Sequence, residues 1–106
     1  MQTIENIDKI IKENPAVMIY FSAPTCNVCH ALKPKLFEAM DKNFEKFKIV
    51  SVDVSLSQDV SAHFGVFAIP TVLVFLDGKE FLRKSRHMSV DMVIKEIQRP
   101  YEIMLR

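Results

Sequence analysis

The chain has 106 residues, which is enough for one compact domain with its own core and too few for two, so we expect a single domain over residues 1–106. Its composition, 49% hydrophobic and 25% charged, argues against disorder. The formal net charge of +1, without a cluster of Lys or Arg, excludes nucleic acid as an expected partner.

The first predicted element is an amphipathic helix over residues 4–13, with Thr3 as its N-cap and Asn14-Pro15 as its stop. Charged residues interrupt its apolar pattern, which is unlike a signal peptide. The longest apolar runs, 16–21 and 71–76, are too short to cross a bilayer. We therefore expect a soluble, cytoplasmic protein with no membrane partner.

Two strands and two helices are predicted next. Residues 16–22 form a short run in which apolar and polar residues do not alternate, which is typical of a strand covered on both faces. Apolar side chains that recur every four residues indicate a long helix from about 26 to 43. Residues 48–54 are predicted as a second strand, and a short helix follows, capped by Ser57 and terminated by Gly65.

The last predicted elements are a hairpin and a helix. Residues 71–76 and 79–85 flank Asp77-Gly78, a two-residue hairpin signal that predicts antiparallel strands. Ser89 begins a final amphipathic helix, which Pro100 is expected to end or kink. The order αβαβαββα, with a parallel crossover between the first two strands, predicts an α/β fold with a mixed sheet and helices on both faces.

Methionine and phenylalanine side chains are expected to fill the core. Methionine is flexible and apolar, so we favour this role over metal binding. The residues assigned in this way include Met18, Met40 and Met92, and Phe64, Phe67 and Phe75.

The two cysteines, Cys26 and Cys29, are predicted to lie where the loop after the first strand becomes a helix. At a helix N-terminus, unpaired N–H groups and the helix dipole stabilise a thiolate, so Cys26 is the expected nucleophile. The i, i+3 spacing places Cys29 one turn later on the same face, where it can resolve a mixed disulfide. A bridge that closes so short a loop would stabilise the fold little. The position predicts thiol–disulfide exchange.

Two other interpretations of the cysteine pair stay open. In one, the pair, with or without His30, binds zinc or a metal cluster, which requires further ligands to complete a tetrahedral set. In the other, the chain is an interaction module without redox turnover. We interpret His30 as a solvated helix residue and not as a catalytic one, and we place His63 and His87 in surface segments.

Beyond the CxxC pair, residues 64–71, Phe-Gly-Val-Phe-Ala-Ile-Pro-Thr, form a second motif. With both motifs the sequence resembles the thioredoxin family over nearly its whole length, and Pro34 matches that family's helix-kinking proline. The resemblance implies the thioredoxin fold, a three-layer α/β/α sandwich with a central mixed β-sheet. It also implies that Pro70 is cis, that its loop faces the cysteines, and that Ile69 contacts the substrate backbone.

The same resemblance implies a protein-disulfide reductase that serves cell redox homeostasis. Its partners would be disulfide-containing protein substrates and an electron donor, either a reductase or a low-molecular-weight thiol. No cofactor and no metal are implied, and we expect a monomer. A glutaredoxin is less favoured, because that family usually has Thr-Val-Pro where this chain has Ala68-Ile69-Pro70.

Five positions depart from the thioredoxin pattern. Thr25 precedes the first cysteine where Trp is usual, so we expect Thr25 to contact substrate without a flat aromatic ring. Asn27-Val28 replace the usual Gly-Pro between the cysteines. Tyr20 stands where a buried Asp is typical, and Arg86 aligns with a Gly of the substrate groove. These replacements bear on substrate choice, reduction potential and proton transfer.

Overall fold

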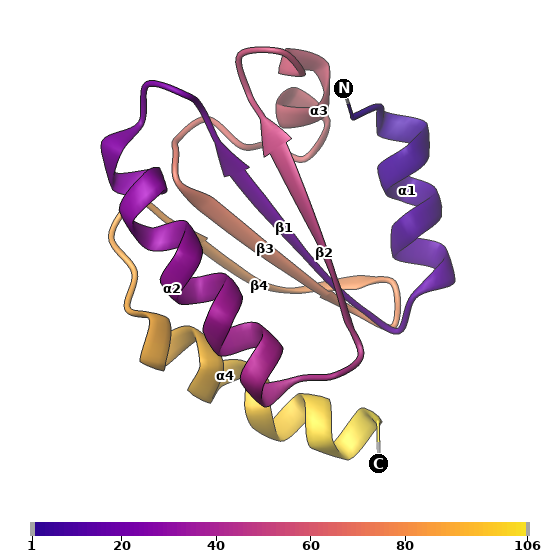
Figure 1. The fold of residues 1–106 in the computed structure, drawn as a ribbon. Helices are drawn as coiled ribbons and strands as arrows, with labels where there is room; N and C mark the ends of the chain where they lie inside the picture. The colour runs from indigo at the N-terminus through magenta and orange to yellow at the C-terminus, as the bar shows by residue number, and fades with distance from the viewer. Residues whose placement is uncertain (1, 106) are drawn as a thin grey trace.

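The computed structural model describes residues 2–105, and its elements follow the predicted order (Figure 1). The helices are α1 (Ile4–Glu13), α2 (Asn27–Asn43), α3 (Gln58–His63) and α4 (Val90–Met104). The strands are β1 (Ala16–Ser22), β2 (Phe47–Asp53), β3 (Thr71–Leu76) and β4 (Lys79–Ser85). Strand β2 begins and ends one residue earlier than predicted, and α4 does not end at Pro100.

Side chains and one glycine set several helix ends. Thr3 and Ser89 cap α1 and α4, because their side-chain oxygens accept hydrogen bonds from backbone N–H groups in the first turn. Ser57 occupies the cap position of α3, but its hydroxyl donates instead to the carbonyl of Gln2 at 3.3 Å. Gly65 follows α3 with a φ of +65°, a conformation that costs glycine little because it has no Cβ.

The sheet is mixed, with the strand order β2-β1-β3-β4. Strands β1 and β2 are parallel, whereas β3 is antiparallel to both β1 and β4, as the crossover and the hairpin signal predict. In this register Phe21 of β1 pairs with Thr71 of β3. The loop that leaves β1 and the loop that enters β3 therefore lie at the same end of the two central strands, and this brings the cysteines near Pro70.

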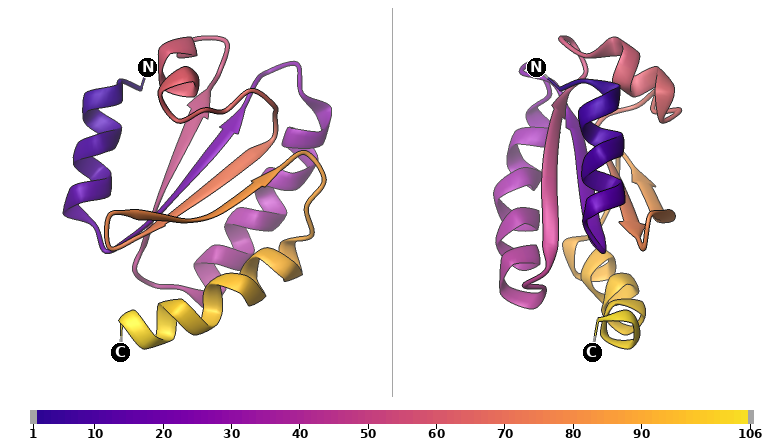
Figure 2. Two further views of the ribbon diagram at one scale, coloured as in Figure 1. Left: turned by 180° about the vertical axis from the view of Figure 1, so that it is seen from behind. Right: turned by 90° about the vertical axis from the view of Figure 1, so that its right-hand side faces the viewer.

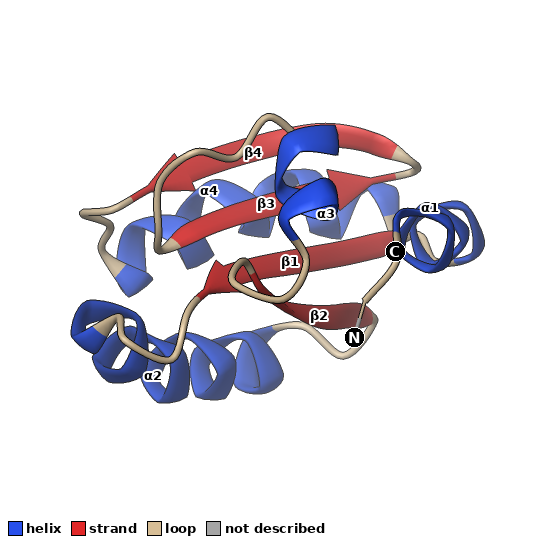
Figure 3. Ribbon diagram, turned by 90° about the horizontal axis from the view of Figure 1, so that it is seen from above, coloured by secondary structure: helices blue, strands red, loops and turns tan. Residues whose placement is uncertain are grey.

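Alternation along β1 divides the interior into two cores, one on each face of the sheet. Under α2 and α4 the strand places Ala16, Met18 and Tyr20, and under α1 and α3 it places Val17, Ile19 and Phe21. The right-hand view of Figure 2 shows the sheet edge-on between its helices, and Figure 3 shows the same layers from above. The predicted three-layer α/β/α sandwich is confirmed.

Two core assignments from the sequence are wrong. Phe67 is 87% exposed, because it lies in the turn between α3 and β3 where its neighbour Val66 takes the inward position. Met92 is 52% exposed, because it lies outside the buried stripe of α4 that Val93 and Ile97 form. The other assigned residues, Met18, Met40, Phe64 and Phe75, belong to or pack against the two cores.

Candidate active site

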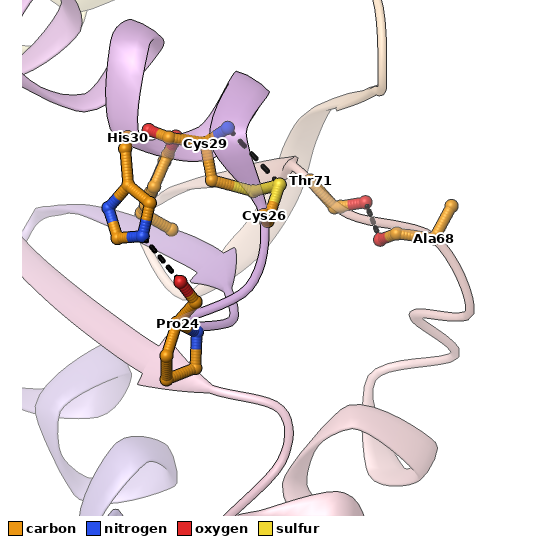
Figure 4. The surroundings of a disulfide bond; sticks show 7 residues. Pro24, Cys26, Cys29, His30, Ala68 and Thr71 are labelled. Atoms are coloured by element: carbon orange, nitrogen blue, oxygen red, sulfur yellow. Dashed lines mark hydrogen bonds between the residues drawn. A yellow bond between two sulfur atoms is a disulfide. The ribbon is translucent and has the colours of Figure 1, made fainter.

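Cys26 occupies the N-cap of α2, directly after the loop that leaves β1 (Figure 4). Its Sγ accepts a hydrogen bond from the backbone N–H of Cys29 at 3.1 Å, and its own N–H donates to the carbonyl of Ala23 at 3.0 Å. A sulfur therefore takes the capping role that a Ser or Asp oxygen usually takes. The N–H group and the positive end of the helix dipole both favour negative charge on this sulfur.

The two cysteines form a disulfide, with their Cα atoms 5.2 Å apart. Their exposure differs sharply. Cys29 is 1% exposed and belongs to the core cluster that includes Leu36, whereas Cys26 is only partly buried at the edge of that cluster. A large substrate can therefore approach the sulfur of Cys26 but not that of Cys29.

Tyr20 lies beneath the first turn of α2. Its phenol donates a hydrogen bond to the carbonyl of Cys29 at 2.8 Å, and its ring makes an edge contact with Phe37 at 5.5 Å between centroids. Burial raises the pKa of Tyr20 above its ordinary value, so the phenol is protonated at neutral pH. Tyr20 therefore braces the helix end that carries Cys29 and is not placed to accept a proton.

The loop before β3, which contains Ile69 and Pro70, lies close to Cys26. The Ile69–Pro70 peptide bond is cis. The buried hydroxyl of Thr71 donates to the carbonyl of Ala68 at 2.6 Å, and the N–H of Arg86 donates to the carbonyl of Pro70 at 2.6 Å. Hydrogen bonds on both sides of Pro70 thus hold the loop in place.

A groove of about 370 Å³ separates this loop from α2. Its lining residues are Cys26, Asn27, Val28, Ile69, Pro70, Arg86 and His87. The structure therefore brings the expected nucleophile together with two of the three residues expected to bind substrate. The third, Thr25, is exposed beside Cys26 in the chain but does not line this groove.

Two contacts that support the site were missed by sequence reasoning. A ring nitrogen of His30 lies 2.8 Å from the carbonyl of Pro24 and ties the loop before Cys26 to the first turn of α2. The guanidinium of Arg83 donates to the carbonyls of Phe64 and Gly65 at 2.7 and 3.1 Å. No periodicity or motif signals either contact, because each depends on segments that meet only in the folded chain.

For the alternative in which the cysteine pair binds a metal, we looked for further ligands within residues 2–105. That part of the chain contains no group of three or more His, Cys, Asp or Glu side chains arranged to hold a metal ion.

The sequence matches the family model described as thioredoxin over residues 1–99. It is 32% identical over 103 residues to the thioredoxin-like protein YdfQ of Bacillus subtilis, and this alignment covers 97% of this chain and 91% of that protein. Thioredoxin 1 from Thermosipho africanus is 33% identical, with a TM-score of 0.76 and coverage of 85% of this chain and 99% of that one. Oxidised mitochondrial thioredoxin 3 from Saccharomyces cerevisiae shares the fold at 24% identity, with a TM-score of 0.82 and coverage of 92% and 90%.

Proposed function

Because the chain belongs to the thioredoxin family, we propose that it reduces disulfide bonds in proteins, with Cys26 as the nucleophile and Cys29 as the resolving thiol. Family membership and a CxxC pair at disulfide distance support thiol–disulfide oxidoreductase activity in general. The observation that carries the assigned roles is the difference in exposure between the two cysteine residues. Cys26 opens onto a groove, whereas Cys29 is 1% exposed.

The proposed reaction has two exchange steps. In the reduced protein, the Cys26 thiolate attacks one sulfur of the substrate disulfide, the substrate S–S bond breaks, and the departing substrate thiolate takes up a proton. Cys29 then loses its proton and attacks the Cys26 sulfur, which closes the Cys26–Cys29 disulfide and releases the second substrate cysteine as a thiol. Two electrons have passed to the substrate, and an external thiol must return them.

Each step uses a feature of the site. The N–H of Cys29, 3.1 Å from the Cys26 sulfur, and the N-terminus of α2 stabilise the attacking thiolate. We assign substrate binding to Thr25, Ile69 and Pro70, with the backbone of Ile69 pairing with an extended substrate segment. Ile69 and Pro70 share the groove with Cys26, which supports this assignment for those two residues.

The proton of Cys29 must leave by a route that does not use Tyr20. The phenol of Tyr20 is protonated and already donates to the Cys29 carbonyl. A second hollow, of about 310 Å³, has Cys29 among its lining residues. Its polar lining consists of Ser22, His30, Lys33, Ser51 and Asp53. We therefore assign proton acceptance to solvent that enters this hollow.

We also propose the setting in which the protein works. The electron donor is a reductase or a low-molecular-weight thiol, the location is the cytoplasm, and the protein acts as a monomer. For residues 2–105, no helix has the length and apolar character needed to cross a membrane.

Insulin reduction driven by dithiothreitol tests the proposal, because reduced insulin B chain precipitates and scatters light. We expect wild-type protein to accelerate precipitation and Cys26→Ser to abolish the acceleration. Cys29→Ser should also lose turnover, but it should form a mixed disulfide with insulin. Circular dichroism establishes that both variants are folded. A Cys26→Ser variant as active as wild type would refute the proposal.

A further inference from the structure

One wall of the groove beside Cys26 is cationic. Arg86 follows β4 with a φ of +62°, and its N–H donates to the carbonyl of Pro70 at 2.6 Å. This bond places Arg86 against the loop that faces Cys26. Both Arg86 and its neighbour His87 are exposed and line the groove.

The charge of Arg86 is available to a ligand, whereas neighbouring charges are already paired. Arg83 forms an ion pair with Glu80 at 2.8 Å, and Lys84 forms one with Glu96 at 3.1 Å. Among the ion pairs of residues 2–105, none brings a carboxylate within 4.0 Å of the Arg86 guanidinium. A carboxylate from a substrate would therefore meet an uncompensated positive charge within the groove that holds the nucleophile.

The hollow continues past Arg86 onto an apolar surface. A second depression, of about 410 Å³, shares Val28, Arg86 and His87 with the first and adds Leu32, Met88 and Ser89. Val28 is 56% exposed between the two depressions. The groove and the second depression together extend from Cys26, past Arg86, to the apolar side chains of Leu32 and Met88. Two adjoining depressions with shared lining residues can accommodate an extended peptide segment.

We infer that Arg86 makes the protein prefer disulfides in which the attacked cysteine has an acidic residue beside it in the chain. The inference rests on the proposed function and names its substrate class. The substrate segment lies along the Ile69–Pro70 loop, its carboxylate contacts the Arg86 guanidinium, and an apolar side chain lies against Leu32 and Met88. Arg86 does not take part in the sulfur chemistry. It orients the substrate and raises the rate of encounter.

Reduction rates of three matched disulfide peptides test this preference. The peptides are identical except that the attacked cysteine is flanked by Glu, Gln or Lys, and the reduced protein is mixed with each in a stopped-flow fluorimeter. At low salt we expect wild type to reduce the Glu peptide about fivefold faster than the Lys peptide, since an exposed ion pair contributes modestly. In 1 M NaCl the ratio should approach one, because salt screens exposed charges.

Variants assign the effect to Arg86. Arg86→Glu should invert the preference, and Arg86→Gly, which suits the positive φ, should remove it. Arg99→Glu is the matched control, because Arg99 is an exposed residue of α4 outside the groove and the change in net charge is the same. This control should keep the wild-type ratio.

Three results would overturn the inference, each in a distinct way. Glu and Lys peptides reduced at rates within twofold of each other would show that Arg86 does not select substrates. Equal effects of Arg86→Glu and Arg99→Glu would assign the preference to net charge alone. Oxidised glutathione reduced faster than the Glu peptide, with the same dependence on Arg86, would identify a small thiol as the ligand. By contrast, failure to reduce even the Gln peptide would refute the proposed function itself.

Discussion

Replacing Tyr20 by Phe removes one buried hydrogen bond and little else. The ring is 0% exposed and keeps its edge contact with Phe37 at 5.5 Å, whereas the hydroxyl that donates to the Cys29 carbonyl at 2.8 Å is lost. That carbonyl belongs to the first turn of α2, where regular helix geometry provides a second donor, the N–H four residues later. We therefore expect Tyr20→Phe to lower the free energy of unfolding by about 1 kcal/mol. In a chain of this size the melting temperature should fall by roughly 5 °C.

Urea unfolding of the oxidised protein measures this loss, and Tyr101→Phe is the matched control. The Tyr101 hydroxyl accepts a hydrogen bond from the N–H of Lys46 at 3.0 Å at an exposed site, so its removal should cost no more than about 0.5 kcal/mol. Burial raises the pKa of Tyr20 in the folded protein above its unfolded value. The stability that its protonated form contributes is thus complete below about pH 10 and is lost as the pH rises through the folded pKa. Above that pH, the free energies of unfolding of wild type and Tyr20→Phe should therefore become more similar.

The same variant separates a bracing role from an acid–base role. Because the phenol is protonated at neutral pH, Tyr20→Phe should leave the shape of the pH profile for insulin reduction unchanged from about pH 6 to 9. A displaced profile would show that Tyr20 exchanges the proton of Cys29, which would refute the assignment to solvent. A stability loss no larger than that of Tyr101→Phe would refute the reasoning about the buried bond.

Three further substitutions test the backbone and the Arg83 contacts by urea unfolding. Gly65→Ala should destabilise the fold by roughly 1–2 kcal/mol, because its φ is +65° while an added Cβ would meet nothing nearer than an Arg83 nitrogen at 4.0 Å. Arg86→Gly should be neutral or stabilising by up to about 1 kcal/mol, because it relieves a φ of +62°. The hydrogen bond from Arg83 lowers the pKa of Glu80. The free energy of unfolding of wild type should therefore exceed that of Glu80→Gln above about pH 4.5, and this stability advantage should disappear as the pH falls. An advantage that persists at pH 2 would contradict that last assignment.

Local rules predict the structure best where one physical requirement decides the outcome. Residues 16–22 form a strand with the predicted bounds, because a strand covered on both faces needs apolar side chains at successive positions, as Ala16 to Phe21 provide. Asp77-Gly78 forms the predicted hairpin because both residues take the positive φ that a two-residue turn needs. Phe67 shows the limit of such rules, since hydrophobicity alone does not determine which way a side chain points in an irregular turn.

In the candidate site, too, sequence patterns predict some features and miss others. The position of Cys26 at the start of α2 follows from the strand–loop–helix pattern, and the second motif directs attention to Ile69 and Pro70. The supports of the site do not follow from any local pattern. Arg83 reaches carbonyls 18 and 19 residues away in the chain, and the phenol of Tyr20 reaches a helix carbonyl from the sheet below. Such contacts depend on how the layers pack.

Mass spectrometry of trapped intermediates tests the assigned roles of the cysteines most directly. Reduced Cys29→Ser protein is mixed with a disulfide-bonded peptide, quenched with acid and digested, and the reverse variant, Cys26→Ser, is treated in parallel. We predict that Cys29→Ser accumulates a stoichiometric mixed disulfide whose protein cysteine is Cys26. Cys26→Ser should accumulate almost none, because Cys29 is 1% exposed. A mixed disulfide that forms on Cys29 as fast as on Cys26 would contradict the account.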